Sequence, residues 1–236
     1  MAAGTGALSV PAGQNGAKVV ATDLAPAMIE RLNKRARAEG LSNVEGRVMD
    51  GTALDVDNDT FDVAVSVNGV SLFPDLARGL AEMVRVTRPG GRVVLVSFGP
   101  LPTVEFIGFV MGAMKATVPG FTPLPVDPPP LQFQVADTKV MRARLSEAGL
   151  RDVAVHTVTC DMAFDSTEHL WNTFRSSNPI GAQFVAALSG ELQAEVKRVL
   201  GGMLRERFGG GATAVLHADI NIGIGIVPGN DNETRP

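Results

Sequence analysis

The chain has 236 residues, of which 45% are hydrophobic and 19% charged, and its formal net charge is −4. This length suffices for one sizeable domain with its own core. The mildly acidic balance, with no cluster of Lys and Arg, predicts neither a nucleic-acid partner nor binding to an anionic membrane.

Cysteine content and hydropathy exclude further classes of protein. Cys160 is the single cysteine, which excludes an internal disulfide framework and a paired-cysteine metal or redox site. No apolar run approaches the roughly 20 residues of a membrane helix, and the N-terminus lacks the pattern of a secretory signal. These features predict a cytoplasmic protein without a membrane span or a metal site.

The first 98 residues alternate short, Val-rich runs with helical patterns. The runs predict buried strands, and the apolar spacing between them predicts amphipathic helices. Strands alternating with helices are typical of a doubly wound, mostly parallel α/β sheet covered on both faces. The expected strands span 18–22, 44–49, 61–67 and 92–97, and the expected helices 26–39 and 75–86.

Residues 99–135 interrupt this rhythm. They are rich in proline, which cannot occupy the centre of a sheet, and they enclose an apolar stretch over 104–114. A long connection of this kind is often functional, so we predict a lid or a wall of the substrate site here. An ordinary surface excursion is the alternative.

Residues 136–227 predict further strands and inserted helices. Helices are expected over 137–148, after the Asp165 capping signal, and over 189–207. A strand is expected over 153–164, and alternating isoleucines predict an antiparallel last strand over 214–227. We therefore predict one domain over residues 1–227, with a cofactor-binding core over 1–98, followed by a disordered tail over 228–236.

A glycine turn and an acidic residue form the first candidate site. Gly4-Thr5-Gly6 precedes a short helical pattern, where glycines allow close approach of a ligand and helix amides favour an anionic group. Asp23 closes the strand over 18–22, and a carboxylate at a strand tip can accept both hydroxyls of a ribose. Each feature alone also fits an ordinary turn.

Three more loops are candidate parts of a ligand site. Two of them follow predicted strands, and the third precedes one. Asp50-Gly51 follows the second strand and could accept from an adenine amino group, with the glycine leaving space for a flat ring. Asn68-Gly69 follows the third strand, and 88–91 turns into the fourth. Ligands of open α/β folds bind at such strand ends.

These motifs resemble, in order and spacing, those of the class I S-adenosylmethionine-dependent methyltransferases. The likeness is greatest to the branch that includes the ubiquinone and menaquinone methylases, and it covers residues 1 to about 98. It implies a Rossmann-like fold and S-adenosyl-L-methionine as cofactor. The motifs are GTG, VVATD, VMDGTA, FDVAVSVNGVSLFPD and RPGGRVVLVSF.

The resemblance also implies roles for individual residues. The glycine turn would line the methionine part of the cofactor, and Asp23 would bind the ribose hydroxyls. Asn68, followed by Gly69, would lie near the sulfonium. The remaining implied contacts, all to the adenine, are Leu24 and Met28 at its flanks and Asp50, Gly51 and Thr52 at its edge.

Three departures from the family pattern carry expectations of their own. No strand or helix precedes the glycine turn, so we expect a break in the sheet between the strands ending at Asp23 and Val67, with unpaired backbone on both. Ala25 stands where a capping Ser or Asp is common, which weakens that helix start. Residues 70–72 do not match the quinone methylases, so a quinone acceptor is not supported.

No catalytic residue is evident from the sequence. Methyl transfer from a sulfonium needs alignment and exclusion of water before it needs an acid or a base. His156, His169 and His217 are more typical of surface positions than of a general base. Trp171 and Phe174 could wall an apolar or aromatic acceptor site or pack in the core.

The leading hypothesis is methyl transfer to a small-molecule acceptor. A cofactor-binding fragment without turnover is the first alternative, favoured by the missing strand. An NAD(P)-dependent oxidoreductase shares the glycine turn and Asp23 but requires a Tyr-x-x-x-Lys pair, and the chain contains no tyrosine.

Overall fold

A computed structural model describes residues 1–122, 124, 128–177, 179–209 and 213–229. Two compact units are present. Unit 1 comprises residues 1–97, 131–157 and 221–236, and unit 2 comprises residues 98–130 and 158–220. The single domain expected over 1–227 stays a prediction, and most of the expected tail, residues 230–236, lies outside the described residues.

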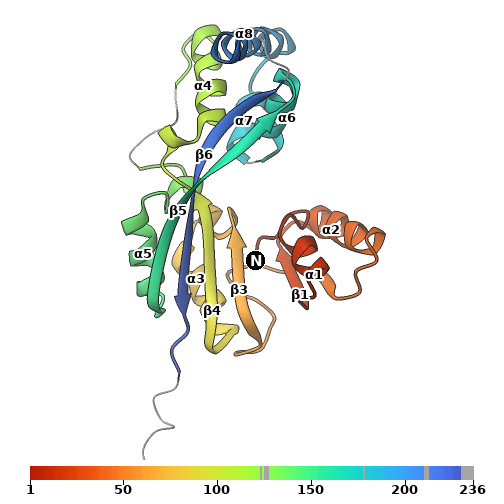
Figure 1. The fold of residues 1–236 in the computed structure, drawn as a ribbon, viewed down its shortest axis with the longest axis vertical. Coiled ribbons are helices and arrows are strands. Elements are labelled where there is room, and N and C mark those ends of the chain that lie inside the picture. Colours follow the sequence, from red (N-terminus) through yellow and green to blue (C-terminus); the bar gives the residue numbers. More distant parts are fainter. Residues whose placement is uncertain (123, 125–127, 178, 210–212, 230–236) are drawn as a thin grey trace, which may run out of the picture. The chain divides into compact units, whose positions relative to one another are not determined.

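The elements of the first half match the predicted α/β pattern closely (Figure 1). β3 has the expected bounds, whereas β4 starts five residues earlier than expected because Thr87 also pairs with Phe61. The elements are α1 (Ser9–Gln14), β1 (Val19–Asp23), α2 (Pro26–Ala38), β2 (Val44–Val48), β3 (Phe61–Val67), η1 (Val70–Leu72), α3 (Leu76–Arg85) and β4 (Thr87–Phe98).

The second half contains most of the helices. The apolar stretch in the proline-rich segment forms α4, and α7 was not among the predicted elements. The elements are η2 (Leu101–Thr103), α4 (Glu105–Thr117), η3 (Leu131–Phe133), α5 (Thr138–Glu147), β5 (Arg151–Phe164), α6 (Thr167–Ser177), α7 (Pro179–Ala186), α8 (Gly190–Phe208) and β6 (Ala214–Ile226).

The strands form two sheets, with orders β1-β2 and β3-β4-β6-β5. β1 pairs with β2 in parallel, and β3 pairs with β4 in parallel. The amide of Val227, directly after β6, donates to the carbonyl of Gly91 on β4, and the amide of Gly99, directly after β4, donates to the carbonyl of Asp219 on β6. Residue numbers thus rise along β4 as they fall along β6, so these two strands are antiparallel. The predicted α/β class with parallel pairs and an antiparallel last strand is confirmed.

The expected break in the sheet lies between β1 and β3, which belong to different sheets. Residues 1–3 contact both edges at this break. The Met1 ammonium donates to the carbonyl of Val65 on β3 over 2.8 Å, and the Ala3 amide donates to the carbonyl of Thr22 on β1 over 2.9 Å. Hydrogen bonds from residues 1–3 therefore link the two sheets of unit 1.

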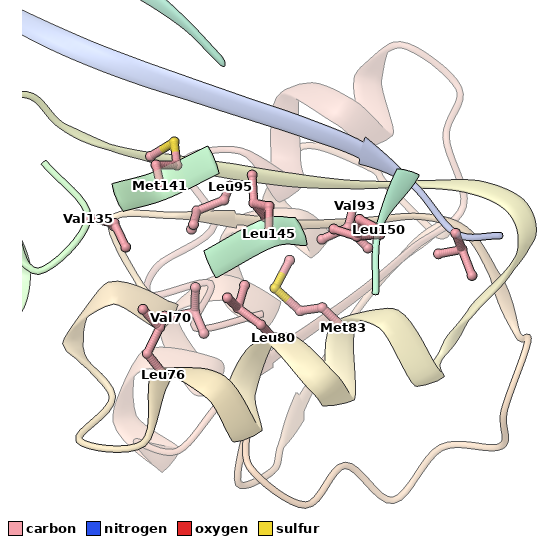
Figure 2. Packing of buried hydrophobic residues seen from close by; sticks show 11 residues of the cluster. Val70, Leu76, Leu80, Met83, Val93, Leu95, Val135, Met141, Leu145 and Leu150 are labelled. Carbon is pink, nitrogen blue, oxygen red and sulfur yellow. The ribbon is translucent and has the colours of Figure 1, made fainter. Parts of the chain in front are cut away.

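Unit 1 contains two apolar clusters. The larger one packs α3 and α5 against one face of β4, with Leu80, Met83 and Leu95 nearly inaccessible to solvent (Figure 2). The smaller one lies between α2 and the β1-β2 sheet and includes Leu32 and Val44. The apolar side chains that recur with helical spacing in the sequence are the ones buried in these clusters. Their burial stabilises the helices at these positions.

Unit 2 packs α4 against α8 and α6 against α7. Phe106 of α4 lies between Phe98 and Phe164, with ring centroids 5.9 and 6.3 Å away. Trp171 and Phe174 are each 2% exposed. Their role is core packing, the less specific of the two roles considered for them.

The first turn of α2 lacks a side-chain cap. Ala25 occupies the N-cap position in extended geometry, as expected, and Pro26 starts the helix. We expect Ala25→Ser to raise the free energy of unfolding by about 1 kcal/mol, because its hydroxyl can accept from a free amide of the first turn. Urea unfolding checks this as a higher midpoint with an unchanged slope. Ala27→Ser, two residues inside the helix, is the matched control, and an equal gain from it would contradict the capping explanation.

Candidate functional site

The candidate site residues follow the carboxyl ends of β1, β2 and β3. Asp23 is the last residue of β1, Asp50 follows β2 by two residues, and Asn68 directly follows β3. In parallel strands these ends share one edge of a sheet, which is where open α/β folds bind ligands. Asp23 and Asp50 share this edge in the β1-β2 sheet, and Asn68 lies at the corresponding edge of the second sheet.

The glycine turn is bonded directly to the acidic end of β1. The amide of Gly4 donates to Asp23 Oδ2 over 2.8 Å. Gly4 and Gly6 have φ of +54° and +87°, in the left-handed region that favours glycine. A Cβ on Gly6 would also lie 3.0 Å from Leu32 Cγ. The turn is therefore shaped by both backbone conformation and close packing on α2.

The Asp23 carboxylate is half-buried and retains acceptor capacity. Oδ2 accepts from Gly4, and Oδ1 accepts from the amide of Ala25 over 2.9 Å. A carboxylate has about four lone-pair sites, so each oxygen can still accept a further hydrogen bond. Leu24 and Met28 beside it are 69% and 37% exposed. An anionic acceptor next to accessible apolar side chains fits a ribose joined to a flat base.

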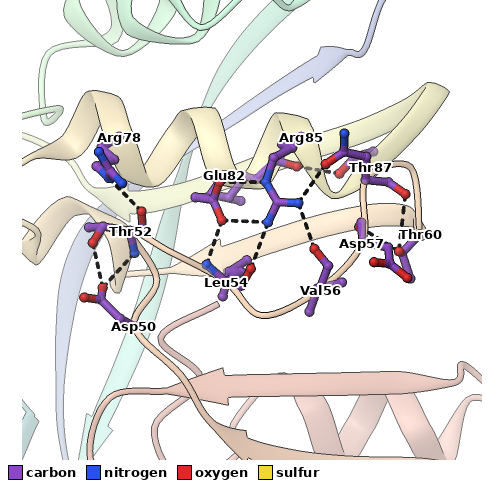
Figure 3. Close-up of polar contacts among 12 residues, drawn as sticks. Asp50, Thr52, Leu54, Val56, Asp57, Thr60, Arg78, Glu82, Arg85 and Thr87 are labelled. Carbon is purple, nitrogen blue, oxygen red and sulfur yellow. Dashed lines mark hydrogen bonds and ion pairs between the residues drawn. The ribbon is translucent and has the colours of Figure 1, made fainter.

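The segment after β2 forms a tight turn around Asp50 (Figure 3). Asp50 Oδ1 accepts from both the amide and the hydroxyl of Thr52, each over 2.8 Å. These two hydrogen bonds, that from the amide first, lower the pKa of the Asp50 carboxyl. Gly51 is buried, and a Cβ there would lie 2.5 Å from the Phe73 ring. Asp50 is thus held ionised and exposed, with its second oxygen able to accept.

The segment after β3 also contains an unusual backbone conformation. Asn68 has φ of +50°, and its amide donates to the carbonyl of Val96 on β4. Gly69 is buried, and a Cβ there would lie 2.5 Å from the Cβ of Ala2. The absence of a side chain at Gly69 therefore makes room for the N-terminal residues.

Sequence reasoning missed residues 1–3 as part of the site. Ala2 has φ of +48°, left-handed for a non-glycine residue, and it directly precedes the glycine turn. The Met1 carbonyl accepts from the hydroxyl of Ser66, which in turn accepts from the amide of Val70. No local signal indicated this, because the contacts of Met1 with Val65 and Ser66 join residues more than 60 positions apart.

The Met1 ammonium is largely withdrawn from water. Burial lowers its pKa from 8.0 to about 6, and the negative charge of Asp23 offsets part of that effect. The amine is therefore neutral in most molecules at pH 7, and its remaining N–H groups can still donate to Val65.

The three histidines are exposed, as the sequence suggested. His156 lies on β5, and Nδ1 of His169 accepts from the amide of Asp165 over 3.3 Å. Nδ1 of His217 lies 2.9 Å from Asp161 Oδ1, a contact within unit 2. None of them is bonded to a residue of the candidate site.

Two further expectations concern metals and membranes. Among the described residues, no group of three or more His, Cys, Asp or Glu side chains could hold a metal ion. Within the same part of the chain, no helix combines the length and the apolar character needed to cross a membrane.

Comparison with known families finds a match in the first part of the chain. Residues 1–91 match the methyltransferase domain family. This match covers β1 to β3, α3, the glycine turn and all three strand ends. The first 91 residues are therefore similar to a methyltransferase domain.

Curated relatives match the chain over about half its length. An uncharacterized protein of Mycobacterium tuberculosis is 38% identical over 131 residues, which are 55% of this chain and 45% of the relative. The demethylmenaquinone methyltransferase of Clavibacter sepedonicus is 37% identical over 126 residues, 52% of this chain and 50% of that protein. The chain thus spans about half the length of the curated relatives it matches.

Solved structures share the fold over almost the whole chain. A putative methyltransferase of Bacillus halodurans has a TM-score of 0.59 at 16% identity, covering 97% of this chain and 90% of that one. A phosphoethanolamine N-methyltransferase of Haemonchus contortus, solved with S-adenosyl-L-methionine, has a TM-score of 0.56 at 16% identity, covering 97% and 47%. The chain therefore shares the α/β fold of these two proteins.

Proposed function

We propose that this chain binds S-adenosyl-L-methionine and transfers its methyl group to a small-molecule acceptor. The observation that carries the proposal is the 2.8 Å hydrogen bond between Gly4 and Asp23, which holds the glycine turn against the acidic end of β1. The match of residues 1–91 to the methyltransferase domain supports it. A cytoplasmic location is part of the same proposal and rests on the composition.

Different residues of this chain would bind different parts of S-adenosyl-L-methionine. Asp23 accepts from the ribose hydroxyls, Asp50 accepts from the adenine amino group, and Leu24 and Met28 cover the ring. The glycine turn and Asn68 lie along the methionine part. The bound cofactor supplies an electrophilic methyl group, and the protein aligns the acceptor with it and excludes water.

Calorimetric titration with S-adenosylhomocysteine tests the proposal. We expect a Kd in the micromolar range, about −8 kcal/mol of binding free energy. NADH is the matched control, because it shares the adenosine moiety but belongs to the alternative oxidoreductase reading. Binding of NADH without binding of S-adenosylhomocysteine would overturn the proposal.

Binding without turnover is the second candidate function, favoured by the break in the sheet between β1 and β3. A labelling experiment distinguishes methyl transfer from binding without turnover. The chain is incubated with methyl-labelled S-adenosylmethionine and a panel of amine, hydroxyl and acidic-carbon acceptors. Label transfer to any acceptor establishes the enzyme. Micromolar binding with no transfer above a heat-denatured control supports the binding fragment.

A further inference from the structure

Residues 50–60, here called the acidic loop, connect β2 to β3 and contain no helix or strand. Only Gly51 among them is buried. The loop carries four aspartates and no basic residue. Little apolar burial and mutual repulsion both oppose a fixed conformation, so polar contacts from outside the loop must hold it.

Arg85 of α3 supplies most of these contacts (Figure 3). Its Nη1 donates to the carbonyl of Val56 over 2.7 Å and to Asn58 Oδ1 over 2.8 Å. Its Nη2 donates to the carbonyl of Leu54 over 2.9 Å. The guanidinium thus binds the acidic loop at three residues with one rigid, planar group.

Glu82, one turn earlier on α3, orients that guanidinium and binds the loop itself. Oε1 accepts from Nε of Arg85 over 2.7 Å, and Oε2 accepts from Nη2 over 2.8 Å, a bidentate pair. Oε2 also accepts from the amide of Leu54 over 2.7 Å. The hydrogen bonds from Arg85 and Leu54 lower the pKa of the Glu82 carboxyl. All five N–H groups of Arg85 are used.

We propose that Glu82 and Arg85 position the acidic loop so that Asp50 can select adenine, although neither side chain reaches the ligand. The inference rests on the proposed function, because it assigns the adenine edge to Asp50. Arg78 also fixes the acidic loop next to Asp50. Its Nε donates to the carbonyl of Thr52, two residues after Asp50, over 2.8 Å. The pair therefore acts as a positioning element.

The test compares two ligands that differ at the adenine amino group. S-inosylhomocysteine has an oxygen there and offers no donor to Asp50. We expect the wild-type chain to prefer S-adenosylhomocysteine by about tenfold, which corresponds to about 1.4 kcal/mol. Arg85→Ala should weaken S-adenosylhomocysteine about tenfold and reduce the preference to less than about threefold. Arg85→Lys keeps the positive charge but lacks the planar guanidinium. Its preference for S-adenosylhomocysteine should lie between that of the wild-type chain and that of Arg85→Ala.

Glu195 and Arg198 of α8 provide a matched control. Arg198 Nε and Nη2 donate to the two oxygens of Glu195 over 2.8 and 2.6 Å, the same spacing and bidentate geometry in unit 2. Arg198→Ala should leave the adenine preference unchanged. If Arg85→Ala also leaves it unchanged while wild type binds, the inference is overturned and the proposed function stands.

Hydrogen exchange supplies a readout without ligand. Protection of the Leu54 amide should fall about tenfold or more in Arg85→Ala and stay at the wild-type level in Arg198→Ala. Unchanged Leu54 protection would overturn the positioning role by itself. If wild type binds neither ligand, the proposed function and the adenine role fail together, whichever way the exchange experiment turns out.

Discussion

Asp23→Ala is expected to weaken binding of S-adenosylhomocysteine at least about a hundredfold. The two charge-assisted hydrogen bonds that we propose between Asp23 and the ribose would be lost, each contributing roughly 1.5–3 kcal/mol. Each 1.4 kcal/mol is about tenfold in Kd. The Gly4 amide also loses its acceptor, so the glycine turn is released at the same time. Calorimetry with wild-type and variant chains measures the change directly.

A cycle that changes both the ligand and residue 23 separates loss of ribose binding from disruption of the glycine turn. The 2′-deoxy analogue of S-adenosylhomocysteine should bind the wild-type chain more weakly than the parent ligand, whereas Asp23→Ala should no longer distinguish the two. Asp62→Ala, which removes an exposed carboxylate paired with Arg88, is the control variant. An Asp23→Ala chain that still prefers the parent ligand would assign the ribose to another residue.

The stability of the chain is expected to rise between about pH 6 and pH 8. The pKa of the Met1 amine is about 6 in the folded chain and 8.0 as its ordinary value. Within this interval the unfolded chain binds more protons than the folded chain, so raising the pH favours folding. The full difference of about two pKa units corresponds to about 2.7 kcal/mol.

Acetylation of the Met1 amine isolates this contribution. The acetylated chain has the same histidines and carboxylates but cannot take up the proton, so the difference between the two pH profiles belongs to the amine alone. Urea unfolding at several pH values measures both profiles. Parallel profiles would show that the amine is solvated in the folded chain.

Local patterns in the sequence determined most of the fold. Val-rich runs predicted β1, β2 and β3 within two residues, and the spacing of Ile29, Leu32 and Ala36 predicted α2. These predictions succeeded because strand and helix periodicity arise from side chains close together in the chain. α7 was missed, since its short apolar segment carries no clear helical stripe.

The candidate site was predictable only in its local parts. Asp23, Asp50 and Asn68 stand out because each directly follows a strand predicted from the sequence. The Glu82–Arg85 pair gave only the signal of opposite charges three positions apart, which is common on exposed helices. Its contacts with Leu54, Val56 and Asn58 span 27 to 31 positions.

The sequence alone determined the order of the strands and of the helices other than α7, the family resemblance and the acidic strand ends. Tertiary structure decided that Met1 and Ala3 join the two sheets, that Ala2 fits against Gly69, and that α3 holds the acidic loop. The physical reason is that these contacts form between segments brought together only when the core of unit 1 packs. No periodicity or motif records such distant pairings before folding.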